Sequence, residues 1–387
     1  MILAAFALLL PPLGVLADKA VVPLAIAAAG AGAFASGPAA RPWSNLERDL
    51  TLALGAFATW CLVSSAWTFK PLEAAPLALR VGLLLFLLLC LATLAQRLGT
   101  AQRGLVARAL CLGFAASFLF IAIELAFGSP ILTLLKGPAE SDYATLSRLN
   151  RGVSAGVILV WPLAALAWLR GYRWIALALP AATLGMTLFS QSSASMLALG
   201  AGVAAALLAA LGRSAARAVM AAAIVMTLFG SPFVAGVAQQ AGLANGDALQ
   251  ATGNYRLHVW NVVSTRIAER PLFGWGFDAS PDLPTADFQP FRPGEKVIPS
   301  HPHNGALQIM VETGLVGSLL VLILLIVVAR RIDRLEPVPR ACAVAMLVTI
   351  LGVAATAYGI WQNHWLTMIG ASAAVFVTVL PAAERTG

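Results

Sequence analysis

The stretch "ALRVGLLLFLLLCLATLAQ", residues 78–96, contains one charged residue in nineteen. About 20 predominantly apolar residues in helical conformation span a hydrocarbon core roughly 30 Å thick, so this stretch predicts a transmembrane helix. The rest of the chain has the same character: 60% of its 387 residues are hydrophobic, 11% are charged, and the mean hydropathy is +0.85. A soluble core of this size cannot cover so much apolar surface. We therefore predict an all-α, polytopic membrane protein.

Similar apolar runs recur along the chain and predict about twelve transmembrane helices in a single integral membrane domain, residues 1–387. The first run resembles the apolar part of a signal peptide, but it lacks a basic leading region and further runs follow it, so we expect an uncleaved anchor. The predicted helices are 1–17, 20–37, 50–67, 78–96, 105–127, 152–169, 173–189, 194–212, 216–237, 304–329, 341–358 and 364–382.

Basic residues indicate the orientation, because short cytoplasmic loops of membrane proteins retain an excess of Lys and Arg. With the N-terminus in the cytoplasm, the cytoplasmic loops hold most arginines, and the short outer loops hold only Lys19, Lys70, Lys136, Arg148 and Arg151. Both termini are then cytoplasmic. The net charge of +8 is mostly a topology signal, and no basic stripe interleaved with aromatic residues indicates nucleic-acid binding.

A long outer loop, residues 238–303, follows the ninth predicted helix and contains three of the four histidines. Loops of this length usually act as lids or binding surfaces. Within it, residues 252–271 predict a helix that is capped by Thr252 or Asn254 and stops at Pro271, with Arg256 in its first turn. A cation there opposes the helix dipole unless an anionic ligand intervenes. The alternative is that Arg256 pairs with an acid or meets solvent.

The motif "SHPHNGALQIMVETGLVG", residues 300–317, joins this loop to the tenth predicted helix. His303 is expected at the start of that helix, and Asn304, Gln308 and Glu312 form a polar stripe along it. Structural alternatives are a capping role for His303 and a helix-to-helix hydrogen bond for Glu312. His301 and His303 also form a possible metal pair, but no spacing typical of a metal site supports it, and we expect neither metal nor cofactor.

Arg148 and Arg151 flank the start of the sixth predicted helix on the same outer side. Binding of lipid headgroups is the ordinary explanation for such residues. Two guanidinium groups and an imidazole on one surface also form a chemical set: guanidinium binds phosphate bidentately, and imidazole removes a proton near neutral pH. This combination fits glycosyl transfer from a lipid-linked diphosphate at the membrane boundary.

The motifs "RLHVW" (256–260), "PLFGWGF" (271–277) and "HNGALQIMVETGLVG" (303–317), in this order, resemble the O-antigen ligase and polymerase superfamily of bacterial membrane glycosyltransferases. The twelve-helix layout, "LNRGVSAGVILVWP" and "SQSSASMLALG" extend the resemblance along the chain. Many relatives carry an arginine within the serine-rich turn, where this chain has Ser192 and Ser193, so an anion contact there is in doubt.

The resemblance implies a ligase of lipopolysaccharide biosynthesis in the bacterial inner membrane, with its active site on the periplasmic face. Such an enzyme moves a glycan from undecaprenyl diphosphate to a sugar hydroxyl of the lipid A core, without a metal and with inversion. It maps an essential arginine onto Arg256, an essential histidine onto His303, and a donor-binding arginine onto Arg151, with Arg148 as the second candidate. His301, Asn304 and Glu312 would support them.

Three other functions stay open at this point. A polymerase of the same superfamily would join glycan repeats to one another, and a related ligase would glycosylate protein. A transporter or flippase for lipid-linked sugars would instead predict charges near the middle of the bilayer, broken helices and an internal repeat. The polar residues gather at one face, which favours transfer at the surface over passage.

Overall fold

The computed structural model describes residues 1–37, 40–138, 147–190, 192–240, 251–291, 294–298 and 300–381. Its architecture is that of an all-α polytopic membrane protein. Within these ranges nine helices are long and apolar enough to cross a membrane, and three apolar helices, α1, α9 and α16, are shorter. Together they occupy the twelve predicted positions.

The first half of the chain forms α1 to α8. The helices among them that correspond to predicted ones begin and end within about five residues of the predicted boundaries, except that α4 starts earlier, whereas the short α6 lies in a predicted loop. Pro71, at the first position of α4, extends this helix toward the predicted loop, since proline fits the first turn of a helix. The helices are α1 (Ile2–Leu16), α2 (Val21–Ala35), α3 (Arg48–Ser64), α4 (Pro71–Gln96), α5 (Thr100–Ala126), α6 (Pro130–Lys136) and α8 (Asn150–Leu169).

The second half forms α9 to α16, and includes a π-helical turn, Met226–Gly230, between α11 and α12. The long loop contains α13 and a 3₁₀ turn, Ser280–Asp282. The helices are α9 (Arg173–Phe189), α10 (Ser193–Ala210), α11 (Arg213–Val225), α12 (Ser231–Gln240), α13 (Ala251–Glu269), α14 (Gly305–Asp333), α15 (Pro337–Thr356) and α16 (Asn363–Val379).

Helix α8 lies at the centre of the bundle. Every residue from Gly152 to Ala167 is buried, because α1, α9, α15 and α16 surround it. Nearby, Trp161 of α8 donates a hydrogen bond from Nε1 to Thr349 Oγ1 of α15 at 2.9 Å. A Cβ at Gly202 of α10 would lie 2.2 Å from the same Thr349 oxygen, so only glycine lets these helices approach.

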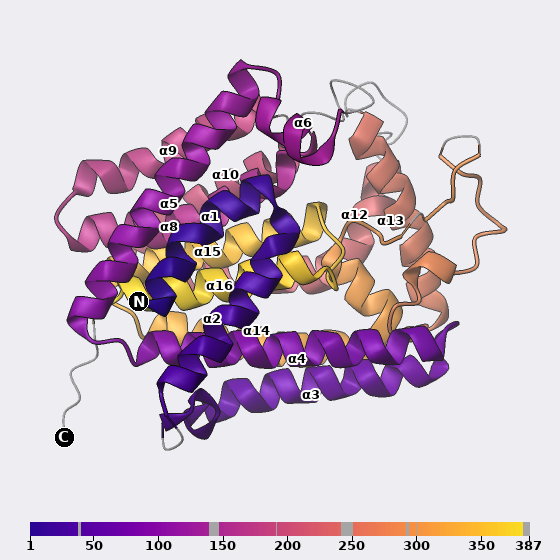
Figure 1. Ribbon diagram of the computed structural model, residues 1–387. Helices are drawn as coiled ribbons and strands as arrows, with labels where there is room; N and C mark the ends of the chain where they lie inside the picture. Colours follow the sequence, from indigo (N-terminus) through magenta and orange to yellow (C-terminus); the bar gives the residue numbers. More distant parts are fainter. Residues whose placement is uncertain are drawn as a thin grey trace.

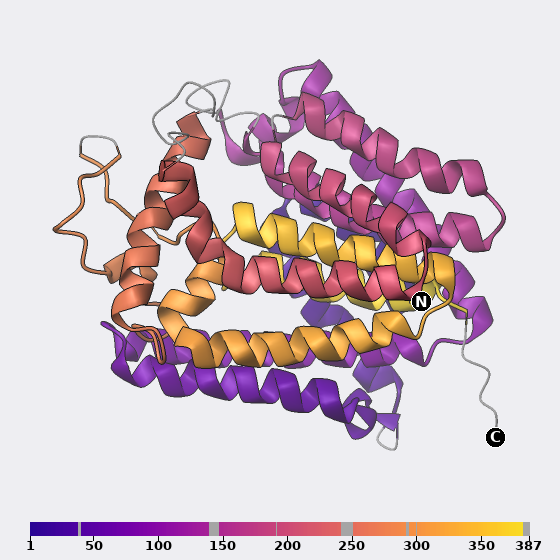
Figure 2. The same cartoon turned by 180° about the vertical axis from the view of Figure 1, so that it is seen from behind.

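The two ends of the bundle differ. Helix α1 begins and α16 ends at one end, whereas α13 and the long loop lie at the other (Figure 1). The starts of α8 and α14 and the loop between α15 and α16 belong to this second end, which we call the site end. Seen from behind, α14 changes direction between a short first part and a long second part (Figure 2).

Candidate functional site

The segment before α14 holds His303 in an unusual backbone conformation. Its φ is 53°, in the left-handed region that non-glycine residues rarely adopt. Two contacts fix the segment: Trp260 of α13 donates from Nε1 to the carbonyl of Pro302 at 2.8 Å, and Asn304 caps α14, its Oδ1 accepting from the amides of Ala306 and Leu307 at 3.1 Å each. Asn304 therefore fixes the start of α14 directly after the histidine.

The two histidines of the motif have different hydrogen-bonding roles. The backbone N–H of His303 donates to His301 Nδ1 at 3.1 Å, and the rings lie 4.3 Å apart between centroids. Burial, together with the charge of His303, lowers the pKa of His301 to about 4. His301 therefore stays neutral near pH 7 and orients the His303 backbone. Among the described residues, no third His, Cys, Asp or Glu joins them in a metal-binding group.

His303 itself is held by the loop that follows α15. Its Nδ1 lies 3.0 Å from the carbonyl oxygen of Ala357, which can only accept, so Nδ1 carries the hydrogen. In this tautomer Nε2 carries the lone pair. Burial lowers the pKa of His303, the bond to Ala357 opposes that shift, and the positive charge of Arg256 lowers the pKa further. His303 is thus a neutral imidazole with a basic Nε2.

Arg256 lies beside His303 but not in the first turn of its helix. Helix α13 already includes Ala251, so the prediction that Thr252 or Asn254 caps it was wrong. Burial of Val259 and Val263 against the start of α14 stabilises the longer helix, which overrides the local capping preference. Trp260, Val263 and Ile267 pack in one apolar cluster with the start of α14. Arg256 acts on His303 from the side of the helix.

Tyr358, in the loop between α15 and α16, is affected by the charges of both Arg151 and Arg256. Burial raises the pKa of Tyr358 to about 12, while a hydrogen bond to Ser154 and the charges of Arg151 and Arg256 lower it. The hydroxyl donates to Ser154 Oγ at 3.0 Å and lies 3.3 Å from the carbonyl of Asn150. The start of α8 and the side of α13 thus converge on the loop that also binds His303.

Arg151 forms an ion pair with Asp18, a residue that the sequence analysis did not single out. One of its Nη atoms lies 2.6 Å from Oδ2 of buried Asp18, and Lys136 Nζ lies 3.4 Å from Oδ1 of the same carboxylate. Arg148 is directed elsewhere: it donates to the carbonyls of Gly137 and Pro138 at 2.6 and 3.2 Å. Of the two predicted candidates, Arg151 is therefore the one joined to the Tyr358 region.

The serine-rich turn reaches the same region through hydroxyl groups. Ser192 donates to Ser195 Oγ at 2.9 Å, and Ser195 lies 3.0 Å from Ser154 Oγ. Because Ser154 donates to the carbonyl of Asn150, Ser195 is the donor to Ser154. The turn therefore fixes the start of α8, and the hydroxyl of Ser192 is already engaged.

Residues 357–362, between α15 and α16, organise the site, and the sequence analysis missed them. The signal was present as a cluster of polar and aromatic residues, "YGIWQNH", between two apolar runs. Gly359 lies against the ring of His301, where a Cβ would come within 2.8 Å. The remaining contacts are Ala357 O with His303, Tyr358 with Ser154, Ile360 N with Gln308 Oε1 at 2.8 Å, Trp361 Nε1 with Glu312 and Gln362 Nε2 with His301 Nε2 at 3.1 Å.

Glu312 is a structural centre and not a partner of His303. Its side chain is fully buried and accepts four hydrogen bonds, which come from three parts of the site end. This carboxylate therefore holds the long loop, α14 and the loop after α15 in one arrangement. The donors are the backbone N–H of Asp278 at 2.8 Å, Gln308 Nε2 at 3.0 Å, Ser280 Oγ and Trp361 Nε1.

The motif "PLFGWGF" pairs with α14 at a break in that helix. Gly314 has φ 69° and ψ −168°, which frees the carbonyls before it and the amides after it. We call the resulting pairing the clasp, formed by residues 271–276 and 311–316. Trp275 N and Gly276 N donate to the carbonyls of 311 and 312 at 2.8 Å each, while the amides of 315 and 316 donate to 271 and 272 at 2.8 and 3.3 Å.

Two glycines of the clasp, Gly274 and Gly314, are required by the close approach of its two backbones. A Cβ at Gly314 would lie 2.2 Å from the carbonyl oxygen of Leu272, and a Cβ at Gly274 would lie 2.6 Å from that of Glu312. Trp60 of α3 completes the clasp by donating from Nε1 to the carbonyl of Thr313 at 2.9 Å. The motif thus has a structural function in the described chain.

An apolar cavity of about 330 Å³ lies between α3, α4, α14, α15 and α16. At the site end its lining includes Gly305 and Ala306, the first residues of α14, together with Ile360 and Trp361. At the other end it includes Leu50 and Ile332. The cavity therefore offers a hydrocarbon environment that extends from directly behind His303 and Asn304 toward the opposite end of the bundle.

Comparison with known proteins agrees with this geometry. A family model described as O-antigen ligase matches residues 175–322, which include Arg256, His303 and the clasp. A protein of Rickettsia prowazekii named as a candidate polysaccharide ligase is 26% identical over 80% of this chain and 76% of its own length. A protein of Rickettsia felis with the same name is 26% identical over 84% of this chain and 78% of its own length. These similarities support a relationship of the chain to the O-antigen ligase superfamily.

Within this O-antigen ligase relative, the site extends beyond the region that the family model matches. Residues 175–322 contain the imidazole and the guanidinium of α13, but Asp18, Arg151 and Tyr358 lie outside them. The complete site therefore depends on contacts between segments from both ends of the chain, which only the folded bundle brings together.

Proposed function

We propose that this protein is a polysaccharide ligase that transfers a glycan from undecaprenyl diphosphate to a sugar hydroxyl of the lipid A core. The observation that carries the proposal is the orientation of His303, whose Nδ1 faces the carbonyl of Ala357 at 3.0 Å and whose Nε2 is basic beside Arg256. An imidazole in this state can take a proton, and the adjacent guanidinium can stabilise an anion.

In the proposed reaction, the oxygen of the acceptor hydroxyl attacks the anomeric carbon of the donor glycan, and His303 Nε2 removes the proton of that hydroxyl. The bond between that carbon and the phosphate oxygen breaks, and undecaprenyl diphosphate leaves with the electron pair. Attack opposite the leaving group inverts the anomeric centre. No metal or cofactor is used in this step. Arg256 and Arg151 neutralise the charge that develops on the diphosphate.

Asp18 reduces the charge that Arg151 offers but does not cancel it. Arg151 and Lys136 share this one carboxylate, so the group keeps a net positive charge of one before Arg256 is counted. A diphosphate that enters between α8 and α13 would therefore compete with the Asp18 carboxylate for Arg151, and Asp18 would keep its ion pair with Lys136. We propose that Asp18 holds Arg151 in position until the donor arrives.

The lipid part of the donor also has a suitable environment. The cavity beside α14 is apolar and begins behind Asn304, so a polyprenyl chain can lie there while its diphosphate faces Arg256. We propose the periplasmic face of the bacterial inner membrane as the location of the site, with both termini in the cytoplasm. The distribution of Lys and Arg among the loops supports this orientation.

One feature resembles the transporter alternative. Helix α14 is broken at Gly314, and broken helices are typical of transporters. In transporters the freed backbone groups bind substrate or ions, whereas here the clasp and Trp60 occupy them. The break therefore shapes the site end and gives no support to a transport path.

The test uses the purified protein with an undecaprenyl-diphosphate glycan and a lipid A core acceptor. We expect transfer by the wild type and a loss of about 10³-fold in His303→Ala, as for removal of a general base. Arg256→Ala should also lose most activity. Arg148→Gln is the matched control, because this guanidinium binds backbone carbonyls, and it should keep the wild-type rate.

The products distinguish the remaining functions. Lengthened glycan from donor alone would show a polymerase, and a glycosylated protein acceptor would show a protein ligase. Transfer at the wild-type rate by both His303→Ala and Arg256→Ala would disprove the mechanism.

A further inference from the structure

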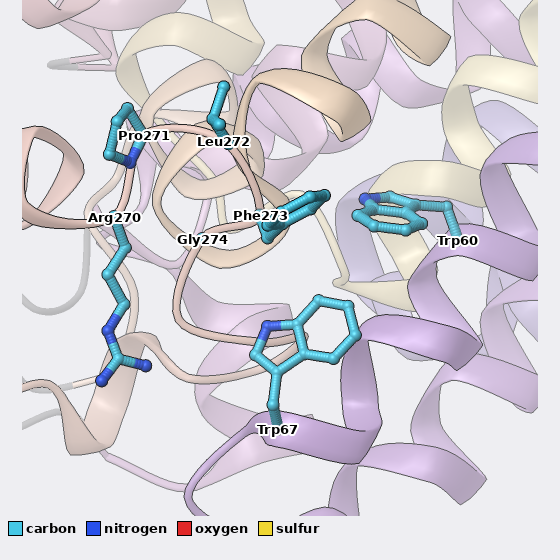
Figure 3. Close-up of a pocket in the computed structure, with 7 residues that line it drawn as sticks. All are labelled: Trp60, Trp67, Arg270, Pro271, Leu272, Phe273 and Gly274. Atoms are coloured by element: carbon cyan, nitrogen blue, oxygen red, sulfur yellow. The ribbon is translucent and has the colours of Figure 1, made fainter.

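A second pocket, of about 640 Å³, lies at the end of α13 that is remote from Arg256 (Figure 3). Trp60 and Trp67, from the end of α3, form one wall, and residues 270–274 form the other. Arg256 and Arg270 are fourteen residues apart along α13 and its continuation, which corresponds to roughly 21 Å in a helix. The pocket is therefore separate from the proposed glycosyl-transfer site.

The surroundings of this pocket are those of a surface that contacts lipid. Leu272, Phe273 and Leu72 are 56%, 57% and 92% exposed, although they are large and apolar. Trp67 ends the candidate membrane span Arg48–Trp67, and tryptophan at this position is typical of the membrane–water interface. The rings of Trp60 and Phe273, from the two walls, lie 6.1 Å apart.

The same pocket contains two donors suited to an anion. The guanidinium of Arg270 is exposed and stacks on Trp275 at 4.0 Å, and within the described part of the chain no carboxylate forms an ion pair with it. Trp67 Nε1 is buried and has no hydrogen-bond acceptor among the described residues. The apolar wall suits the acyl chain of a phospholipid. The positive charge of Arg270 and the unsatisfied N–H of Trp67 at its margin suit the phosphate.

We propose that this pocket binds an anionic phospholipid from the leaflet at the site end. The phosphate accepts hydrogen bonds from Arg270 and from Trp67 Nε1, and an acyl chain lies against Trp60 and Phe273. Pro271 and Leu272, which line the pocket, also supply the carbonyls that hold α14 in the clasp. The bound lipid therefore stabilises the clasp. This binding does not require that the protein be a glycosyltransferase.

Native mass spectrometry of the purified full chain tests the proposal with phosphatidylglycerol and phosphatidylcholine as probes. The wild type should retain phosphatidylglycerol in preference. Arg270→Gln should weaken its binding roughly tenfold, since it removes a charged hydrogen bond, and Trp67→Phe by a few-fold, since it removes a neutral one. Arg270→Lys should keep part of the preference, because it keeps the charge.

Arg173→Gln is the matched control. Arg173 also stacks on a tryptophan, Trp168, at 5.4 Å, but at the opposite end of the bundle and away from this pocket. Its lipid binding should equal that of the wild type. A second measurement, quenching of tryptophan fluorescence by brominated phosphatidylglycerol, should decrease in Trp67→Phe.

Three results would overturn the proposal. Arg270→Gln could bind phosphatidylglycerol as tightly as the wild type, or the wild type could bind both lipids equally. Alternatively, millimolar inorganic phosphate could displace the lipid completely, which would show a site for free anions.

Discussion

The two ends of the first part of α14 differ in what their polar residues do. One end orients an imidazole, and the other holds the fold together. At the N-terminal end, His301 and Ala357 orient His303 and leave its Nε2 with a lone pair. Further along the helix, the carboxylate of Glu312 accepts hydrogen bonds from four donors, and the clasp pairs the backbone groups that the break at Gly314 frees. Polar residues at both ends look alike in the sequence, but only one end presents a group that is prepared to react.

The largest expected effect is on the structural end. Glu312→Ala leaves four donors without an acceptor in a buried place, so the free energy of unfolding should fall by about 3 kcal/mol or more. Thermal unfolding in detergent measures this change. The parallel variant His303→Ala should unfold at nearly the wild-type temperature. Equal stability of Glu312→Ala and wild type would show that the two ends do not differ in this way.

Gly314→Ala should break the clasp more locally. The new Cβ would lie 2.2 Å from the Leu272 oxygen, and φ at this residue is 69°, so we expect a loss of about 2 kcal/mol. Gly185→Ala is the control, since nothing lies within 4 Å of its Cβ in helix α9, and it should leave stability unchanged or slightly raised. Similar unfolding temperatures for the two variants would contradict the clasp.

At the reactive end, His301→Ala removes the acceptor of the His303 N–H. We expect transfer to slow roughly tenfold, since the base is no longer held in its left-handed conformation. His301→Asn should restore most of the rate, because its amide oxygen can replace Nδ1 as acceptor. Separate measurement of kcat and KM tests this role, because loss of a positioning residue should lower kcat and leave KM nearly unchanged. Failure of Asn to restore the rate, with intact folding, would argue against this positioning role.

The smallest effect concerns pH. The pKa of His303 lies below its usual value of 6.5, so the neutral base persists under mildly acidic conditions and the rate should fall only at lower pH. Arg256→Lys keeps the positive charge and should keep this acid limb. Arg256→Gln removes one cause of the lowering, so the limb should move toward 6.5. The pH dependence of kcat/KM, measured on the residual rate, decides this.

Much of the fold follows from hydropathy alone, because a span of fixed thickness requires apolar runs of fixed length. All twelve runs became helices, and α8 and α16 begin within two residues of their predicted starts. The break at Gly314 was not predictable in this way, since "VETGLVGS" keeps its helical hydropathy while its glycine takes a non-helical conformation. The cause is the approach of residues 271–274, which lie forty residues earlier in the chain.

The candidate site residues likewise divide into those that stand in local sequence motifs and those that only long-range contacts bring in. His303 and Arg256 stand in recognisable motifs, and the positive charge of Arg256 acts on the His303 ring. Asp18 and Ser154 carry no local signal, because their roles come from contacts across more than 130 residues. The choice between Arg148 and Arg151 likewise depended on where α6 and the α1–α2 connection lie.

Asp18 has a wider consequence. It lies between α1 and α2, yet its carboxylate is the counter-ion of Arg151 in α8. The connection between the first two helices thus supplies the counter-ion of a guanidinium in the proposed site, although it holds none of the proposed reacting groups. Cleavage of the chain after α2 would leave this counter-ion in place as long as the two fragments stayed associated, whereas dissociation of the fragments would release a guanidinium to the nearest lipid phosphate.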